Sequence, residues 1–174
     1  MESIDVGLLA LRVLVGLVFL GHGLAKVTTR FNGLGTETAT GIFEDLGYRP
    51  GRPYLLLAAW TEIVAGLAFG LGLATPLAAA ALIGVMVNAA GAGKVGKGPW
   101  YFNGGWEYDL TLGAIAAAVA FTGPGTVSLD NALDWDPASV AAGAAALAVG
   151  LVSGLVVLAL RARARAVEPV AQPR

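Results

Sequence analysis

The stretch VGLLALRVLVGLVFLGHGLA, residues 6–25, decides the fold. It contains one permanent charge, Arg12, and it has the roughly 20 residues that a helix needs to cross the hydrocarbon layer of a bilayer. Four further stretches of similar length and apolarity lie at residues 53–73, 76–93, 105–122 and 139–160. We therefore expect an all-α integral membrane protein, a bundle of transmembrane helices.

The eleven Lys and Arg residues are distributed unevenly between the two sides of the membrane that the spans define. Apart from Arg12, they lie between the first and second spans, between the third and fourth, or after the fifth, and residues 123–138 contain none. Basic residues accumulate in cytoplasmic loops, so we expect a cytoplasmic C-terminus and an N-terminus outside. Residues 1–165 then form a single transmembrane domain, and residues 166–174 a disordered cytoplasmic tail.

Composition excludes several classes of protein. Hydrophobic residues make up 56 %, charged residues only 13 %, and the mean hydropathy is +0.72, whereas soluble proteins have roughly 25 % charged residues. Without cysteine, the chain can form no disulfide, thiolate metal site or cysteine-ligated iron–sulfur cluster, and its one histidine cannot supply two axial haem ligands. We expect membrane lipid as a partner, no nucleic acid and no metal site.

Glycine spacing predicts where the spans touch. Three pairs each fall on one helix face: Gly66 with Gly70, Gly84 with Gly91, and Gly150 with Gly154. Glycine lets helix backbones approach closely, although it is common in membrane helices in any case. We expect the fifth span to pack on the other four by its Gly143, Gly150 and Gly154 face, or to mediate formation of a homo-oligomer.

Between the spans, only residues 27–52 form a long connection. Its apolar residues are interspersed with threonine, glycine and acids. This pattern predicts a short interfacial helix over residues 37–46, closed by Gly47.

Arg12 and Glu62 are charged groups inside spans. An ionised group near the bilayer centre costs at least about 2.5 kcal/mol unless it is paired, so both should point into the bundle. At about 1.5 Å per residue, Arg12 lies roughly 10 Å and Glu62 roughly 16 Å from the outer ends of their spans. We predict an intramembrane ion pair between them, which either sets the helix register or handles a ligand or protons.

A second polar cluster is predicted near the cytoplasmic ends of the spans. It consists of His22, Lys26, Asn88, Glu107 and Asp109, with Trp106 and Tyr108 beside them. Polar groups that converge at one depth of a bundle are typical of a ligand pocket. Simpler explanations remain open: acids suit a helix N-terminus, lysine snorkels to the surface, and aromatic residues form interfacial belts.

Several motifs resemble those of a known family. GGWEYDL (residues 104–110) opens the fourth span, and GPG (123–125) and SLD (128–130) follow it. The first span has the pattern R-x3-G-x2-F-x3-G-x2-K, and the second has Glu62 followed by Gly66 and by Thr75-Pro76. Over about residues 6–133 the chain resembles the DoxX family of small bacterial membrane proteins. The resemblance implies a four-helix core, which makes the fifth span an addition.

The resemblance also implies a function. Members of the family are similar to the small subunit of a thiosulfate:quinone oxidoreductase, and one relative is associated with superoxide dismutase and a thiosulfate sulfurtransferase. We therefore expect a subunit or anchor of an oxidoreductase assembly in the bacterial plasma membrane, linked to thiol, sulfur or oxidative-stress chemistry, with quinone as its ligand and such soluble enzymes as partners.

Two hypotheses remain open at this stage. In the first, the chain is such a subunit and is not catalytic alone; its inner polar cluster binds the quinone, with His22 or Glu107 as proton donor or acceptor. In the second, it is a carrier of small molecules or cargo, since the family is distantly similar to a class of cargo receptors, and Arg12 with Glu62 lines a polar path.

Overall fold

The computed structural model describes residues 2–167, and every regular element within them is a helix. The long helices are α1 (Ser3–Val27), α3 (Gly51–Leu71), α4 (Thr75–Gly91), α5 (Glu107–Thr122) and α7 (Val140–Val167). The short elements are η1 (Arg30–Asn32), α2 (Gly35–Asp45), η2 (Val95–Lys97), η3 (Tyr101–Asn103) and α6 (Leu129–Ala132). The all-α bundle of four core helices and an additional fifth is confirmed.

The long helices differ in their reach across a membrane. α1, α3 and α7 are each long and apolar enough to cross it, whereas α4 and α5 have 17 and 16 residues. At about 1.5 Å per residue, the two shorter helices cover roughly 25 Å. α7 runs beyond the predicted fifth span to Val167, and the remainder of the predicted tail, residues 168–174, lies outside the described residues.

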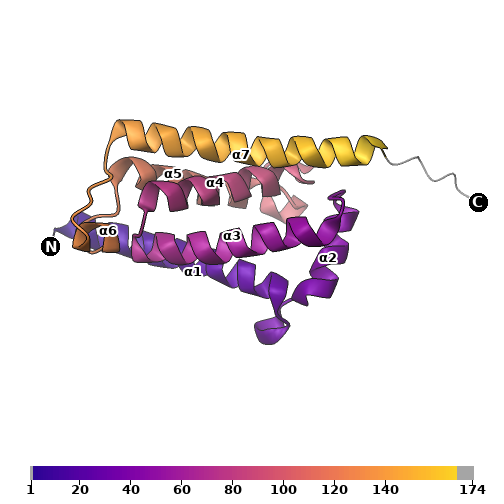
Figure 1. Ribbon diagram of the computed structural model, residues 1–174, viewed down its shortest axis with the longest axis horizontal. Coiled ribbons are helices and arrows are strands. Elements are labelled where there is room, and N and C mark those ends of the chain that lie inside the picture. Colours follow the sequence, from indigo (N-terminus) through magenta and orange to yellow (C-terminus); the bar gives the residue numbers. More distant parts are fainter. Residues whose placement is uncertain (1, 168–174) are drawn as a thin grey trace, which may run out of the picture.

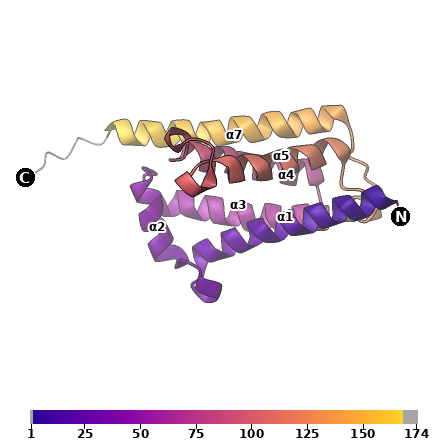
Figure 2. The same ribbon diagram turned by 180° about the vertical axis from the view of Figure 1, so that it is seen from behind.

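The helices form three layers. α4 and α5 make the middle layer, with α7 on one side and α1 with α3 on the other (Figures 1 and 2). Phe19, Phe69, Leu82, Leu112 and Val119 fill the core between the layers. The described lysines and arginines other than Arg12 gather where α1, α4 and α7 end, which we call the basic end; the opposite end, where α1 begins, is the N-terminal end.

The register of α1 on α3 is set by glycines. A methyl group added at Gly16 would come within 2.6 Å of the carbonyl oxygen of Gly66, and one added at Gly23 within 2.6 Å of that of Ala59. No larger residue fits without displacing backbone, so these positions bring the two antiparallel helices into direct contact. If either helix slid along the other, larger side chains would move into the contact positions, where only the hydrogen of a glycine fits.

Close contacts through glycines also join α7 to the middle layer. Gly154 lies against the carbonyl oxygen of Gly84, Gly150 against Ile83 of α4, and Gly143 against Phe121 of α5. The glycine face predicted for the fifth span therefore packs on the core. Where a short interfacial helix is predicted, the structure has helix α2, and Gly47 follows it with a φ of +92°.

At the N-terminal end, Asp130 joins two loops. Its carboxylate accepts hydrogen bonds from the backbone N–H groups of Ala74 and Thr75 and from the Thr75 hydroxyl, at 2.7 to 3.0 Å. Ser128 caps the helix that carries Asp130, because its Oγ accepts the N–H of Asn131. The motif residues at this end thus act on the fold, holding the α3–α4 turn against the chain that follows α5.

Replacing Gly150 or Gly154 by leucine should lower the melting temperature in detergent. Each new side chain would overlap α4, and overpacking of a close contact typically costs about 1–3 kcal/mol. Gly21→Leu is the matched control, since a Cβ added at this α1 glycine meets nothing within 4 Å. Equal melting temperatures for all three variants would show that the α4–α7 contact does not depend on these glycines.

Candidate ligand cavity at the basic end

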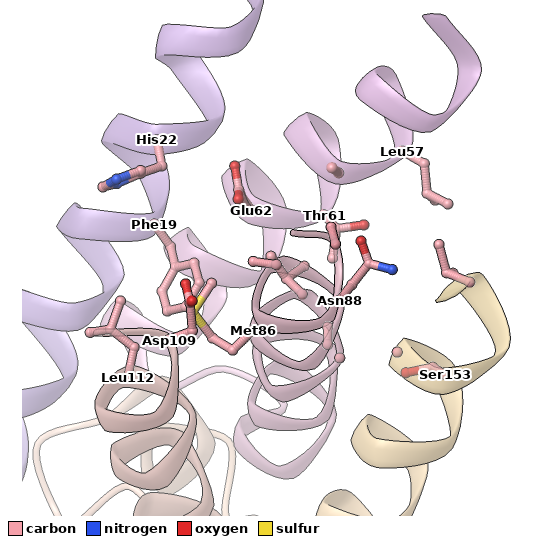
Figure 3. A pocket seen from close by; sticks show the side chains of 18 of the residues that line it. Phe19, His22, Leu57, Thr61, Glu62, Met86, Asn88, Asp109, Leu112 and Ser153 are labelled. Atoms are coloured by element: carbon pink, nitrogen blue, oxygen red, sulfur yellow. The ribbon is translucent and has the colours of Figure 1, made fainter. Parts of the chain in front are cut away.

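A cavity of about 1240 Å³ occupies the basic half of the bundle. All five long helices line it, together with Phe43 of α2 and with Leu46 and Tyr48 just after α2. Figure 3 shows its interior, with Glu62 and Thr61 on α3, Asn88 and Met86 on α4, Asp109 and Leu112 on α5, and Ser153 on α7. Most of the wall surface is apolar, and each of the five long helices also contributes at least one polar residue to it.

Most of the predicted cluster lies on this one cavity. His22, Lys26, Asn88, Glu107, Tyr108 and Asp109 line it, whereas Trp106 is not among its lining residues. His22 is exposed; its Nδ1 lies 2.9 Å from the carbonyl oxygen of Val18, and its ring is next to that of Tyr108, with centroids 6.1 Å apart. The structure thus brings together residues from α1, α4 and α5, and whether they bind a ligand remains a prediction.

Lys26 and Glu62 form a largely buried ion pair in the wall of the cavity. Lys26 Nζ lies 2.5 Å from Glu62 Oε2, and their side chains are 19 % and 6 % exposed. Lys26 Nζ also donates to the carbonyl oxygen of His22 at 3.3 Å. The pair joins the last turn of α1 to the middle of α3, and each charge neutralises the other where water is scarce.

The predicted pair of Arg12 with Glu62 is therefore wrong. The glycine register places Arg12 opposite Gly72, which is ten residues and about 15 Å along α3 from Glu62. The first turns of α1 extend past the end of α3 and pack on the loop after α5, where Asp5 accepts the N–H of Thr126. Arg12 is fully buried there and donates to the carbonyl oxygen of Val127.

A second ion pair lies across the cavity. Lys94 Nζ contacts both carboxylate oxygens of Asp109, at 2.7 and 2.9 Å, which joins the segment after α4 to the first turn of α5. Glu107 has a local role, because its Oε1 accepts the N–H of Tyr101 at 2.7 Å. Of the two acids that open α5, Asp109 is thus held by a cation and Glu107 by the preceding turn.

Asn88 presents an unused hydrogen-bond donor. Its Oδ1 accepts a hydrogen bond from the Tyr48 hydroxyl at 2.7 Å, and its buried Nδ2 has no hydrogen-bond partner among the described residues. Burial raises the pKa of Tyr48, which keeps the phenol protonated and donating. The amide nitrogen points toward the α7 side of the cavity in Figure 3.

The other buried nitrogens without a hydrogen-bond partner in the described chain are on Arg12. Arg12 is packed against Gly72 at the N-terminal end and does not line the cavity, so a ligand there cannot reach it. An unpaired donor in a buried site costs about 1–3 kcal/mol. Asn88 is thus the buried, unpaired donor that a ligand in the cavity could satisfy.

Arg161 braces the wall of the cavity at the basic end. Its Nε donates to the carbonyl oxygen of Leu46 at 2.6 Å, and its Nη2 donates to that of Ala92 at 2.8 Å. The guanidinium also lies over the Tyr48 ring, 5.5 Å from its centroid. Leu46, Tyr48 and Ala92 all line the cavity, so the end of α7 holds that part of the wall in place.

Sequence reasoning missed several members of the site. Glu62 was expected elsewhere, and Tyr48, Thr61 and Lys94 were not predicted to take part. For Lys94 a signal existed, because a lysine directly after a span and an acid at the start of the next lie at the same depth. Nothing comparable marked Tyr48, since its position depends on how the connection after α2 folds back over α4.

Comparison with known proteins places the chain in a family. The profile described as DoxX matches residues 7–94. A protein of Bacillus subtilis (strain 168), described as "Putative oxidoreductase CatD", is 30 % identical over 129 residues, which cover 74 % of this chain and 88 % of that protein. The chain belongs to the DoxX family. The DoxX match ends before α5 and α7, and no solved structure matches the chain.

The Lys26–Glu62 pair of this DoxX protein should show strong coupling. Glu62→Gln and Lys26→Gln should each lower the melting temperature in detergent, because each leaves a charge without its partner, which costs about 3–5 kcal/mol when burial is complete. The double variant should lose less than the two single losses combined.

Arg12→Gln combined with Glu62→Gln is the control for this cycle. The two residues share no contact, and effects at independent sites add. A measured coupling of Glu62 to Arg12, or its absence for Glu62 and Lys26, would contradict the ion pairing described above.

Proposed function

We propose that this protein is the membrane subunit of an oxidoreductase system and that its cavity binds the headgroup of a lipid-soluble quinone. The observation that carries the proposal is the unpaired amide nitrogen of Asn88 on an otherwise mostly apolar cavity. Such a donor fits a ligand that is apolar over most of its surface and bears a hydrogen-bond acceptor, and a quinone carbonyl oxygen is one. The oxidoreductase description of the Bacillus subtilis relative supports the same class of function.

The charged residues of the cavity suit proton handling. Reduction of a quinone to a quinol takes up two electrons and two protons, and the bound quinone supplies this carrier chemistry. In the proposal, the chain orients the headgroup through Asn88, excludes water with its apolar walls and holds exchangeable protons at the Lys26–Glu62 pair. His22, exposed and one helical turn before Lys26, connects this pair to solvent.

Electrons come from a partner enzyme in this proposal. The two electrons and two protons come from oxidation of two thiols to a disulfide on that partner, since this chain has no cysteine of its own. The family resemblance suggests soluble enzymes such as superoxide dismutase and a sulfurtransferase as further members of the assembly. We place them on the cytoplasmic side of the bacterial plasma membrane, at the basic end. The support is the positive-inside rule: the described Lys and Arg residues other than Arg12 gather at this end, next to the cavity.

Asn88→Leu should weaken binding of menadione, a quinone without a long tail, about fivefold or more. The substitution keeps the size of the side chain but removes the donor, and a buried acceptor left unpaired costs about 1–3 kcal/mol. Calorimetric titration of the detergent-solubilised protein measures the effect. Asn131→Leu, an exposed site at the opposite end, is the control and should bind as the unmodified protein does. Absence of quinone binding to the unmodified protein, with or without an apolar tail on the quinone, would refute the quinone proposal.

The orientation can be tested separately, because the chain has no cysteine. Asn131→Cys and Ala166→Cys place single thiols on exposed positions at opposite ends, and both leave the Ser128 cap intact. An impermeant maleimide should label Asn131→Cys in intact cells and Ala166→Cys only after permeabilisation. The reverse pattern would put the basic end outside.

A further inference from the structure

The cavity continues as a groove toward the N-terminal end. A second cavity of about 480 Å³ lies there, and three residues line both: Leu77 and Ala80 of α4 and Val149 of α7. The remaining lining residues of the second cavity come from the start of α4, the start of α7 and the segment around Trp135. The two spaces thus share a wall along α4.

Beside the main cavity the groove is bounded by three helices, and beside the second cavity by α4, α7 and the segment around Trp135. α4 packs against both α3 and α7 and lies between them (Figure 1). Its surface in the groove includes the small residues Ala80, Ala81 and Gly84, with Leu77 at the N-terminal side. The flanking residues Leu57 on α3 and Val149 on α7 line the cavity and are also 56 % and 55 % exposed. Because these side chains both line the cavity and are exposed on the outside of the bundle, the cavity opens sideways, toward the lipid.

The groove has a polar end and an apolar end. Asn88, Thr61 and Ser153 lie in the basic half, where Figure 3 shows them around one space. From Asn88 toward Leu77 the wall formed by α4 is apolar over eleven residues, or about 17 Å of helix. The main cavity alone exceeds the roughly 300–1000 Å³ of ordinary small-molecule sites, so a headgroup would leave most of it unfilled.

We propose that the groove between α3 and α7 binds the apolar tail of the ligand whose headgroup occupies the cavity. This proposal rests on the proposed function and adds that the ligand is a tailed quinone, with its chain lying along α4. Leu77, Ala80 and Val149 line both spaces, so the groove offers the tail an apolar path that leads out of the cavity toward the N-terminal end. The fifth helix then has a binding role, because α7 supplies one wall of the groove.

The test compares two naphthoquinones, menadione without a tail and menaquinone-4 with four prenyl units. Leu77→Trp and Val149→Trp, singly and together, should fill the groove, since both residues line both cavities and Leu77 is 69 % exposed. The control is Val152→Trp with Leu155→Trp, at exposed α7 positions that line neither cavity. Partitioning into detergent is the same for all variants, so the change in affinity between variants measures the groove.

We expect the unmodified protein and the control to bind menaquinone-4 at least tenfold more tightly than menadione. The groove variants should lose this preference and retain menadione affinity, which also shows that the cavity is folded. A groove variant that keeps the preference would overturn the tail site while leaving the headgroup site intact. Loss of bound phospholipid with the preference unchanged would also overturn it, because the groove would then be an ordinary lipid site. Failure of both quinones to bind the unmodified protein would instead refute the proposed function.

Discussion

The contact of α1 with α3 through glycines is the constraint on which the rest of the structure depends. Gly16 and Gly23 face backbone of α3 directly, so the two helices have a single close-packed register. That register places Lys26 opposite Glu62 and Arg12 opposite Gly72. The register of α1 on α3 therefore determines which charged groups meet in the cavity and which are enclosed at the N-terminal end.

Much of the fold could be predicted because membrane helices can be recognised in a sequence by their length and apolar composition. The spans, the glycine face of α7 and helix α2 followed from local patterns, and so did the common depth of His22, Lys26 and Asn88. The partner of Glu62 could not be predicted in the same way. Counting from span ends assumes that helices start level, whereas α1 begins two to three turns before it meets α3, in order to pack on the loop after α5.

The two ends of the bundle use polar groups differently. At the N-terminal end, Asp130 receives three hydrogen bonds from the α3–α4 turn, and Arg12 is enclosed beside Gly72. Both Asp130 and Arg12 are tied to loops, and neither lines a cavity. At the basic end, the pairs Lys26–Glu62 and Lys94–Asp109 border open space. The family motifs thus divide: SLD and Thr75-Pro76 act on the fold, while Lys26, Glu62 and Asp109 lie where chemistry could occur.

The fifth helix changes what a four-helix core can enclose. Through Gly150 and Gly154 it approaches α4 closely enough for Ser153 and Val157 to become part of the cavity wall. Its last turns bring Arg161 to Leu46, Ala92 and the ring of Tyr48. Tyr48 in turn holds Asn88 Oδ1, which leaves Nδ2 as the free donor. Helix α7 lies outside the DoxX match, yet through Arg161 it stabilises Tyr48, which orients Asn88. The unpaired amide of Asn88 is the feature that best distinguishes this cavity from a space filled by lipid.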